Sequence, residues 1–328
     1  MGSLDVFDPS EVRINDDMSL DGGADTDATQ PGVQSRHVSM GVAELKLKGE
    51  DRHDIRTVDV HGETIWLGVV ADGHGGRDIA CHCTKTLLVL LLDLLDEPPS
   101  GRAIRRASER AFLLLHDQAL EMKHTTAGTT LTLVAVNPQR EELTISHCGD
   151  SVARLVPSRS PARGLCEDHR LDSSTEERAR ISKLGGTIAR AMDRYGRPSG
   201  PLRLWPGGVA QARAVGDRDV GHFIDARPYT STVRLPASES CSIVVCSDGV
   251  WDALLPSAVN ALTRQSMSNP AELSANLIVQ SALTQRHAYS NEGDRLPKDD
   301  TTCIVIRVED MDDPLKSSRT RARSCGCM

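Results

Sequence analysis

The strongest constraint on the fold is an apolar run that ends abruptly in an acid. Residues 65–71 read Ile-Trp-Leu-Gly-Val-Val-Ala, and Asp72, Gly73 and His74 follow directly. A short run rich in β-branched and apolar residues predicts a buried strand, so Asp72 lies where that strand leaves the core. Glycine lets the backbone turn tightly and approach a ligand closely. Taken alone, an Asp-Gly pair fits an ordinary turn as well as a binding site.

The same pattern recurs along the chain. Acids stand at the ends of further strand-like runs as Asp248, Asp150, the pair Asp299-Asp300 and the pair Glu50-Asp51. Acids at the ends of several strands can converge at one edge of a sheet. Like charges gathered in this way need either raised pKa values or a bound cation.

The order of elements predicts an α+β fold. Strands are expected at about 38–48, 55–60, 64–71, 128–136, 142–146, 152–156 and 303–308, helices at 77–96, 101–123, 174–184 and, in two pieces, 256–287, and a long loop at 190–207. Helices come in pairs between groups of strands and do not alternate with them one by one. This order favours an antiparallel β-sandwich with flanking helices over a doubly wound parallel sheet.

Composition limits the class of protein. The formal net charge of the 328 residues is −8, which argues against a nucleic-acid partner because phosphate contacts need a basic face. The nine cysteines are scattered, which favours a reducing, cytoplasmic location and leaves the nucleus open. Cys81-His82-Cys83 has no matching second half, so core thiols are expected there and not a zinc site.

Three regions are expected. Residues 1–36 predict a disordered acidic arm, because the first thirty carry eight acids and one base. Residues 37–310 form the folded domain, expected to be monomeric. Residues 311–328 form a basic tail that ends Cys325-Gly-Cys-Met, the outline of a prenylation box. Cys327 is not the usual aliphatic residue, so an unmodified tail and a lipid-anchored tail with peripheral membrane contact both stay open.

The acids also restrict the chemistry. Carboxylates without thiolate or imidazole partners select hard cations such as Mg²⁺, Mn²⁺ or Ca²⁺, and the spacing of an EF-hand is lacking. Two divalent ions that share carboxylates can lower the pKa of a bridging water and hold a phosphoryl group. Hydrolysis of a phosphate ester is therefore the expected reaction, with His74 able to protonate the leaving alkoxide.

At this point the order of the motifs becomes recognisable. The motifs are Glu50-Asp51-Arg52, Asp72-Gly73-His74-Gly75-Gly76, Gly128-Thr129-Thr130, Gly149-Asp150-Ser151, Asp168-His169, Gly185-Gly186, Ala214-Val215-Gly216-Asp217, Ser247-Asp248-Gly249-Val250-Trp251-Asp252 and Asp299-Asp300-Thr301-Thr302. Across about residues 37–310 the chain resembles the protein phosphatase 2C family of metal-dependent Ser/Thr phosphatases. The resemblance implies a central pair of antiparallel sheets with helices on both faces, four layers in the order α/β/β/α. It also implies phosphoprotein substrates, two Mg²⁺ or Mn²⁺ ions and direct attack by water, with no phosphoenzyme intermediate.

The resemblance assigns roles to individual residues. The ligands of the two metals would be Asp72, the Gly73 carbonyl, Asp248 and Asp299, with Glu50 and Asp51 binding directly or through water. Asp150 and Asp252 match acids that can hold a weaker third ion. His74 matches the proposed general acid, and the loop 190–207 corresponds to a variable flap beside the substrate groove.

The chain also departs from the family pattern. Lys46 stands where the family has a phosphate-binding Arg, which keeps the charge but loses the two-pronged guanidinium. Val152, Leu171 and Asp300 replace the usual Arg, Pro and Asn. No metal ligand is lost, which favours an active enzyme. The alternatives are a catalytically silent binding module and a domain that a divalent ion stabilises without turnover.

Overall fold

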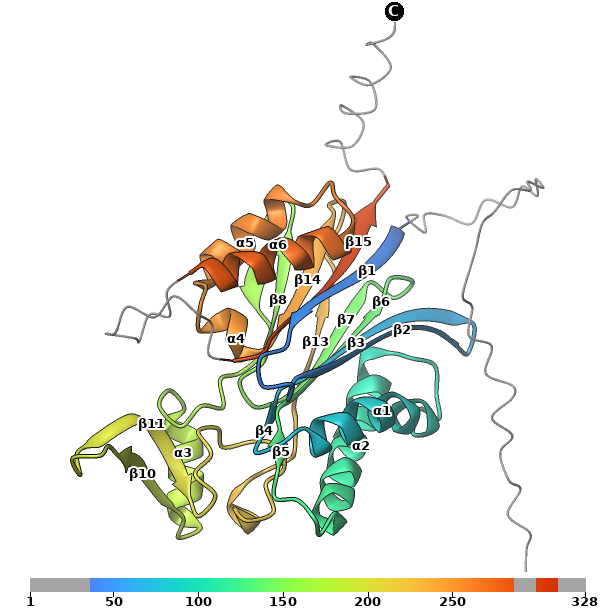
Figure 1. Ribbon diagram of the computed structural model, residues 1–328. Coiled ribbons are helices and arrows are strands. Elements are labelled where there is room, and N and C mark those ends of the chain that lie inside the picture. The colour runs from blue at the N-terminus through green and yellow to red at the C-terminus, as the bar shows by residue number, and fades with distance from the viewer. Residues whose placement is uncertain (1–35, 286–298, 312–328) are drawn as a thin grey trace, which may run out of the picture. The chain divides into compact units, whose positions relative to one another are not determined.

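The computed structural model describes residues 36–285 and 299–311 (Figure 1). The predicted acidic arm, up to residue 35, and the predicted tail from residue 312 with Cys325 lie outside the described residues. Both therefore stay predictions.

The first of two five-stranded sheets joins the two ends of the domain. Its order is β1 (Arg36–Leu45), β15 (Thr301–Asp310), β14 (Cys241–Cys246), β8 (Val152–Pro157) and β9 (Arg163–Gly164). Every pair is antiparallel, and β1 pairs with β15 along its whole length. The acids that precede β15 therefore lie beside the loop that follows β1.

The second sheet is also antiparallel throughout. Its order is β13 (Tyr229–Arg234), β7 (Glu142–Cys148), β6 (Leu131–Asn137), β3 (Glu63–Ala71) and β2 (Arg52–Val60). His61 and Gly62 both have positive φ, 50° and 79°, which suits a tight hairpin between β2 and β3. The strands expected at 55–60 and 64–71 are therefore present and joined by a hairpin.

Helices cover the outer face of each sheet, which confirms the four-layer α/β/β/α prediction (Figure 1). On the second sheet lie α1 (Asp78–Asp93) and α2 (Gly101–Glu121), and on the first lie α4 (Asp248–Trp251), α5 (Pro256–Gln265) and α6 (Ala271–Thr284). At Gly41 in β1, an added Cβ would lie 2.0 Å from the backbone nitrogen of Glu272. Glycine is needed there because α6 packs directly on the strand.

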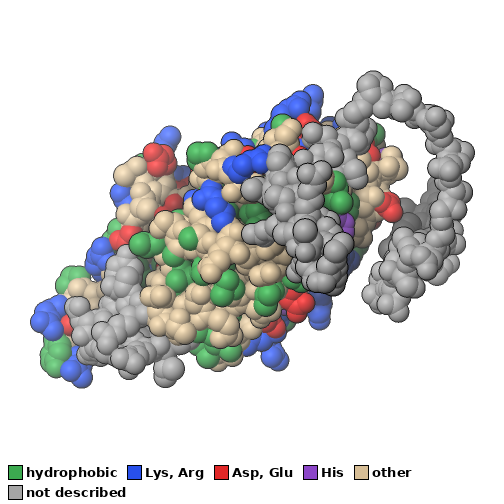
Figure 2. All heavy atoms as spheres, turned by 90° about the horizontal axis from the view of Figure 1, so that it is seen from above, with side chains coloured by type: hydrophobic (Ala, Val, Ile, Leu, Met, Phe, Trp, Pro, Cys, Tyr) green, Lys and Arg blue, Asp and Glu red, His purple; other side chains and the backbone are tan. Residues whose placement is uncertain are grey.

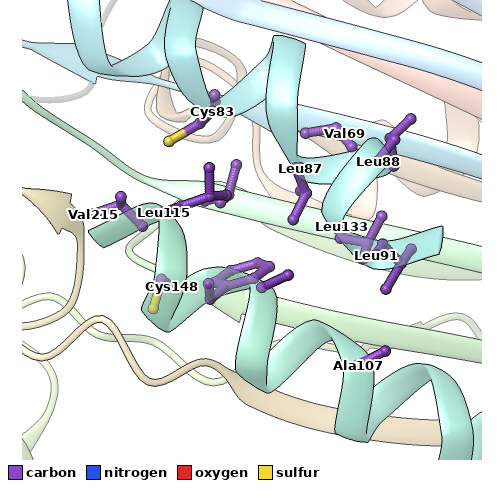
Figure 3. Packing of buried hydrophobic residues seen from close by; sticks show 14 of the residues in the cluster. Val69, Cys83, Leu87, Leu88, Leu91, Ala107, Leu115, Leu133, Cys148 and Val215 are labelled. Carbon is purple, nitrogen blue, oxygen red and sulfur yellow. The ribbon is translucent and has the colours of Figure 1, made fainter. Parts of the chain in front are cut away.

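Three apolar cores separate the four layers. One fills the space between the sheets, one lies under α4–α6, and one lies between the second sheet and α1 and α2. Figure 3 shows the last of these, in which Cys83 of α1 lies among Leu87, Leu115 and Val215. Burial raises the pKa of the Cys83 thiol. The predicted core role is therefore confirmed for Cys83.

The prediction of a loop at 190–207 is wrong. Most of these residues belong to a hairpin of β10 (Thr187–Met192) and β11 (Pro198–Trp205), which follows α3 (Thr175–Lys183). The Asp193 carboxylate closes the turn by accepting the N–H groups of Tyr195 and Arg197 at 2.8 and 2.9 Å. The prolines of β11 suggested a loop, but a two-stranded ribbon consists of edge strands, which tolerate proline.

The surface carries side chains of every kind. Figure 2 shows green hydrophobic side chains interspersed with uncharged tan surface, while many of the Lys and Arg side chains lie toward the edges. Such scattered apolar exposure is ordinary for a folded protein. Within residues 36–285 and 299–311, no helix is long and apolar enough to span a bilayer.

Candidate active site

A small three-stranded sheet brings distant parts of the chain together at the candidate site. Its strands are β4 (Gly73–His74), β5 (Gly128–Thr129) and β12 (Val215–Gly216), in the order β12-β5-β4. The N–H of Thr130 and the hydroxyl of Thr129 donate to the carbonyl of Asp72 at 2.9 and 3.0 Å. The segment that follows β3 is therefore held by hydrogen bonds as well as by packing.

An open cavity of ≈ 390 Å³ lies beside this sheet. The acids that line it are Asp72, Asp150, Asp217, Asp219, Asp248 and Asp299, and Gly73 and His74 line it too. Three further predicted site residues lie close enough for their charges to act on this group: Glu50 acts on His74, Asp51 on Asp72 and Asp252 on Asp248. Lys48 and Arg203 are the Lys and Arg side chains in its wall.

The charged form of Asp72 is strongly disfavoured in this cluster. Its side chain lies almost wholly inside the protein, and 9% of the residue is exposed. Burial raises the pKa of Asp72 well above its ordinary value, and the charges of Asp248 and Asp51 raise it further. Asp248 shares this environment: burial first, then Asp150 and other acids, raises its pKa well above the usual range.

Asp51 and Glu50 sit in a loop that is wrapped around Asp300. The Asp300 carboxylate accepts the backbone N–H groups of residues 47–51: those of Leu47, Lys48 and Gly49 on Oδ1, and those of Glu50 and Asp51 on Oδ2.

These contacts shift two carboxyl groups in opposite directions. Burial opposes the charge on Asp300, but the five N–H donors outweigh it and lower the pKa of Asp300 to about 2. For Asp51, burial outweighs the hydrogen bond from Thr302 and raises the pKa to about 6. Sequence reasoning noted Asp300 only as a departure from Asn and missed its role in shaping the loop.

His74 is held on both ring nitrogens. Its Nε2 lies 2.7 Å from Asp217 Oδ1, and its Nδ1 lies 3.1 Å from the side-chain amide of Gln211. Burial alone would lower the pKa of His74, but the charge and hydrogen bond of Asp217 outweigh it, so the pKa is raised. Gly128 makes room for this contact, because an added Cβ would lie 2.3 Å from Asp217 Oδ2. The pattern of the sequence carried no signal for Gln211.

The two lysines near the loop differ in position. Lys46, the predicted phosphate-binding residue, forms an ion pair with Glu44 at 2.6 Å and is not brought to the cavity wall. Lys48 lines the cavity, and its Nζ lies 2.6 Å from Asp299 Oδ2. Burial alone would lower the pKa of Lys48, but Asp299 outweighs it, so the pKa is raised.

A second cation reaches the cluster from the segment before α3. Arg170 Nε donates to Asp150 Oδ2 at 2.9 Å, and Arg170 Nη2 lies 3.0 Å from Asp252 Oδ1. The two acids predicted to hold a weaker third ion are therefore brought together, with a guanidinium between them.

The donor set at Asp72 suits a divalent cation. No Lys or Arg of residues 36–285 and 299–311 forms an ion pair with Asp72, although several carboxylates surround it. Among these residues, no three Asp, Glu, His or Cys side chains already close on one point as metal ligands. Carboxylate and carbonyl oxygens are what Mg²⁺ and Mn²⁺ prefer, so Asp72, Gly73, Asp248 and Asp299 fit the predicted ions in chemistry.

Fold and site together define an antiparallel β-sandwich protein with an acidic cavity at its strand ends, whose carboxylates suit a divalent cation. The family model for protein phosphatase 2C matches residues 38–292. The chain belongs to the protein phosphatase 2C family.

Curated relatives agree with this assignment. The chain is 34% identical over 284 residues to "Probable protein phosphatase 2C 5" of Arabidopsis thaliana, an alignment that covers 84% of this chain and 63% of the relative. It is 35% identical over 246 residues to "Probable protein phosphatase 2C 3" of Oryza sativa subsp. japonica, covering 74% and 48%. The chain thus spans about half to two thirds of the length of these relatives.

Solved structures share the fold. A serine-threonine phosphatase 2C from Toxoplasma gondii aligns with a TM-score of 0.62 at 16% identity, covering 84% of this chain and 94% of that one. A C. elegans sex determining protein aligns with a TM-score of 0.66 at 21% identity, covering 83% and 64%. At such identities the likeness supports the architecture alone.

Proposed function

We propose that this chain is a protein serine/threonine phosphatase that hydrolyses phosphoserine and phosphothreonine with two Mg²⁺ or Mn²⁺ ions. The observation that carries the proposal is the carboxylate cluster around Asp72, which is buried and lacks a basic partner in the described chain. Asp72, the Gly73 carbonyl, Asp248 and Asp299 would hold the ions, with Glu50 and Asp51 in support. When bound, the ions supply positive charge to the phosphoryl oxygens and lower the pKa of water.

The chain's own groups complete the reaction. Water attacks phosphorus, the P–O bond to the Ser or Thr oxygen breaks, and inorganic phosphate and the free hydroxyl side chain are released without a phosphoenzyme. His74 delivers a proton to the leaving oxygen, and the charge and hydrogen bond of Asp217 raise the pKa of His74 and so favour its protonated form. Lys48 and Arg203 bring positive charge to the cavity wall, where an anionic substrate would enter.

Phosphate release from a phosphothreonine peptide tests this function. We expect release that requires Mn²⁺ or Mg²⁺, stops with EDTA, and falls at least a thousandfold in Asp248→Asn. The matched control Asp93→Asn changes an exposed carboxylate of α1 and should keep the wild-type rate.

Two outcomes would contradict the proposal. Folded protein that binds Mn²⁺ but releases no phosphate at any metal concentration would favour a domain stabilised by metal without turnover. Folded protein that neither binds Mn²⁺ nor releases phosphate would favour a binding module.

A further inference from the structure

We propose that Arg170 is a built-in cation that replaces a third divalent ion between Asp150 and Asp252, so that the site binds two ions and not three. This inference rests on the proposed two-ion centre. It concerns acids that lie beside Asp72 but differ from it in having a guanidinium partner.

The contacts of Arg170 make it a bridge. Nε donates to Asp150 at 2.9 Å and Nη2 lies 3.0 Å from Asp252, so one planar group holds both carboxylates. Hydrogen bonds between guanidinium and carboxylate are charge-assisted and fix direction as well as distance. Because Asp150 follows β7 and Asp252 follows α4, the bridge ties the two sheets' loops together at the cavity.

The backbone places the Arg170 side chain in advance. Its neighbours His169 and Leu171 are both buried, and Arg170 pairs with Gln211 in an antiparallel bridge. Side chains alternate in extended chain, so burying both neighbours turns Arg170 the other way. Its N–H also donates to the Asp168 carboxylate at 2.9 Å. The backbone therefore sets the direction in which the Arg170 side chain leaves the chain.

Lys48 also pairs with a carboxylate of the cluster, but it differs from Arg170 in the number of its partners and in its exposure. Its ammonium group pairs with Asp299, one acid where Arg170 pairs with two, and its side chain is 47% exposed, against 33% for Arg170. The other Asp299 oxygen, Oδ1, accepts the backbone N–H of Asp300 at 2.9 Å, so Lys48 neutralises Asp299 from one side. Arg170 engages one oxygen of each of two acids and is anchored on both sides.

A third ion would have to displace this guanidinium. A divalent ion bound to the remaining oxygens of Asp150 and Asp252 would stand within a few ångströms of the positive charge of Arg170, where like charges repel strongly. Asp72 has no such competitor in the described chain. Selectivity for two ions therefore follows from which carboxylates are already neutralised.

Counting bound Mn²⁺ tests the proposal without using activity. Isothermal titration calorimetry and the EPR signal of free Mn²⁺ would be applied to the full chain in wild-type form and as Arg170→Gln. We expect two sites in the wild type, and a third in Arg170→Gln that binds Mn²⁺ roughly tenfold or more tightly than any third wild-type site. Arg234→Gln, which changes a highly exposed arginine paired with Glu141, is the matched control and should leave two sites.

Two further variants guard against misfolding and confusion with the metal centre itself. Asp252→Asn in the wild-type background should leave the count at two, and in Arg170→Gln it should remove the third site. Arg170→Lys should give intermediate third-site affinity, since an ammonium lacks the two-pronged geometry.

The outcomes separate this inference from the proposed function. Equal third-site affinity in wild type and Arg170→Gln, or loss of a wild-type ion in Asp252→Asn, would overturn the role of Arg170. Wild-type protein without bound Mn²⁺ would overturn the two-ion centre. In that case a site gained by Arg170→Gln would still support the role of Arg170, and no gain would overturn it.

Discussion

Replacing Asp300 by Asn should destabilise the protein, although the change is nearly isosteric. The carboxylate is 1% exposed and accepts five backbone N–H groups, three on one oxygen and two on the other. Asn keeps one acceptor oxygen and turns an NH₂ toward at least two of these donors. Each orphaned donor costs about 1–3 kcal/mol.

The pKa of Asp300 gives an independent magnitude. A folded-state pKa of about 2 against an ordinary value of 3.8 corresponds to about 2.5 kcal/mol of stability from ionisation. The two routes measure overlapping effects, so we expect Asp300→Asn to lose about 3 kcal/mol. Urea unfolding in EDTA at neutral pH measures the loss without a contribution from bound metal. The exposed Asp93→Asn should change stability by less than about 0.5 kcal/mol.

Acid titration adds a second check on the same residue. The folded-state pKa of Asp300 lies below the unfolded-state pKa. The charged carboxylate therefore makes its full contribution to stability above about pH 4, and this contribution is lost as the pH falls toward 2. The stability difference between wild type and Asp300→Asn should therefore shrink over that interval. A loss below about 1 kcal/mol at neutral pH, or a difference independent of pH between 5 and 2, would refute the reasoning.

The remaining predictions concern packing, the metal-free site and His74. Gly41→Ala should lose about 3 kcal/mol in urea unfolding, since its Cβ would lie 2.0 Å from the backbone of α6; unchanged stability would contradict that packing. The pKa of Asp51 is raised to about 6, so the charged carboxylate opposes folding above that pH. The melting temperature measured in EDTA should therefore rise when the pH is lowered from 7 to 5, and a fall would contradict the raised pKa. In Gly128→Ala the new Cβ would lie 2.3 Å from Asp217 and should displace the Asp217 carboxylate that bonds His74. We expect kcat to fall roughly tenfold with KM little changed, and an unaltered kcat would contradict a role for Asp217 in positioning His74.

Sequence reasoning identified the acids at strand ends because the physical signal is local. Asp72 and Asp248 each follow a short apolar run, and the end of such a run is also the end of a buried strand. The contact between Asp217 and His74 has no such signal. It spans 143 positions of sequence and depends on two-residue strands, which are too short to show periodicity.

The hairpin of β10 and β11 escaped prediction for a different reason. Pro198, Gly200 and Pro201 disfavour a central strand, and the pattern was interpreted as a loop. The Asp193 turn and the register that pairs Ile188 with Leu204 outweigh those preferences. Both residues contribute to the small apolar cluster near α3, so tertiary packing decides the conformation.

Acids that look alike in the sequence differ in what balances their charge, and this difference bears on where metal binds. Asp300 is balanced by backbone N–H groups, Asp150 and Asp252 by Arg170, and Asp72 by no Lys or Arg in residues 36–285 and 299–311. A carboxylate whose charge is already matched gains less from a cation than one surrounded by other acids. Divalent ions should therefore be drawn first to Asp72, and the cluster is better described by its unmatched charge than by its number of acids.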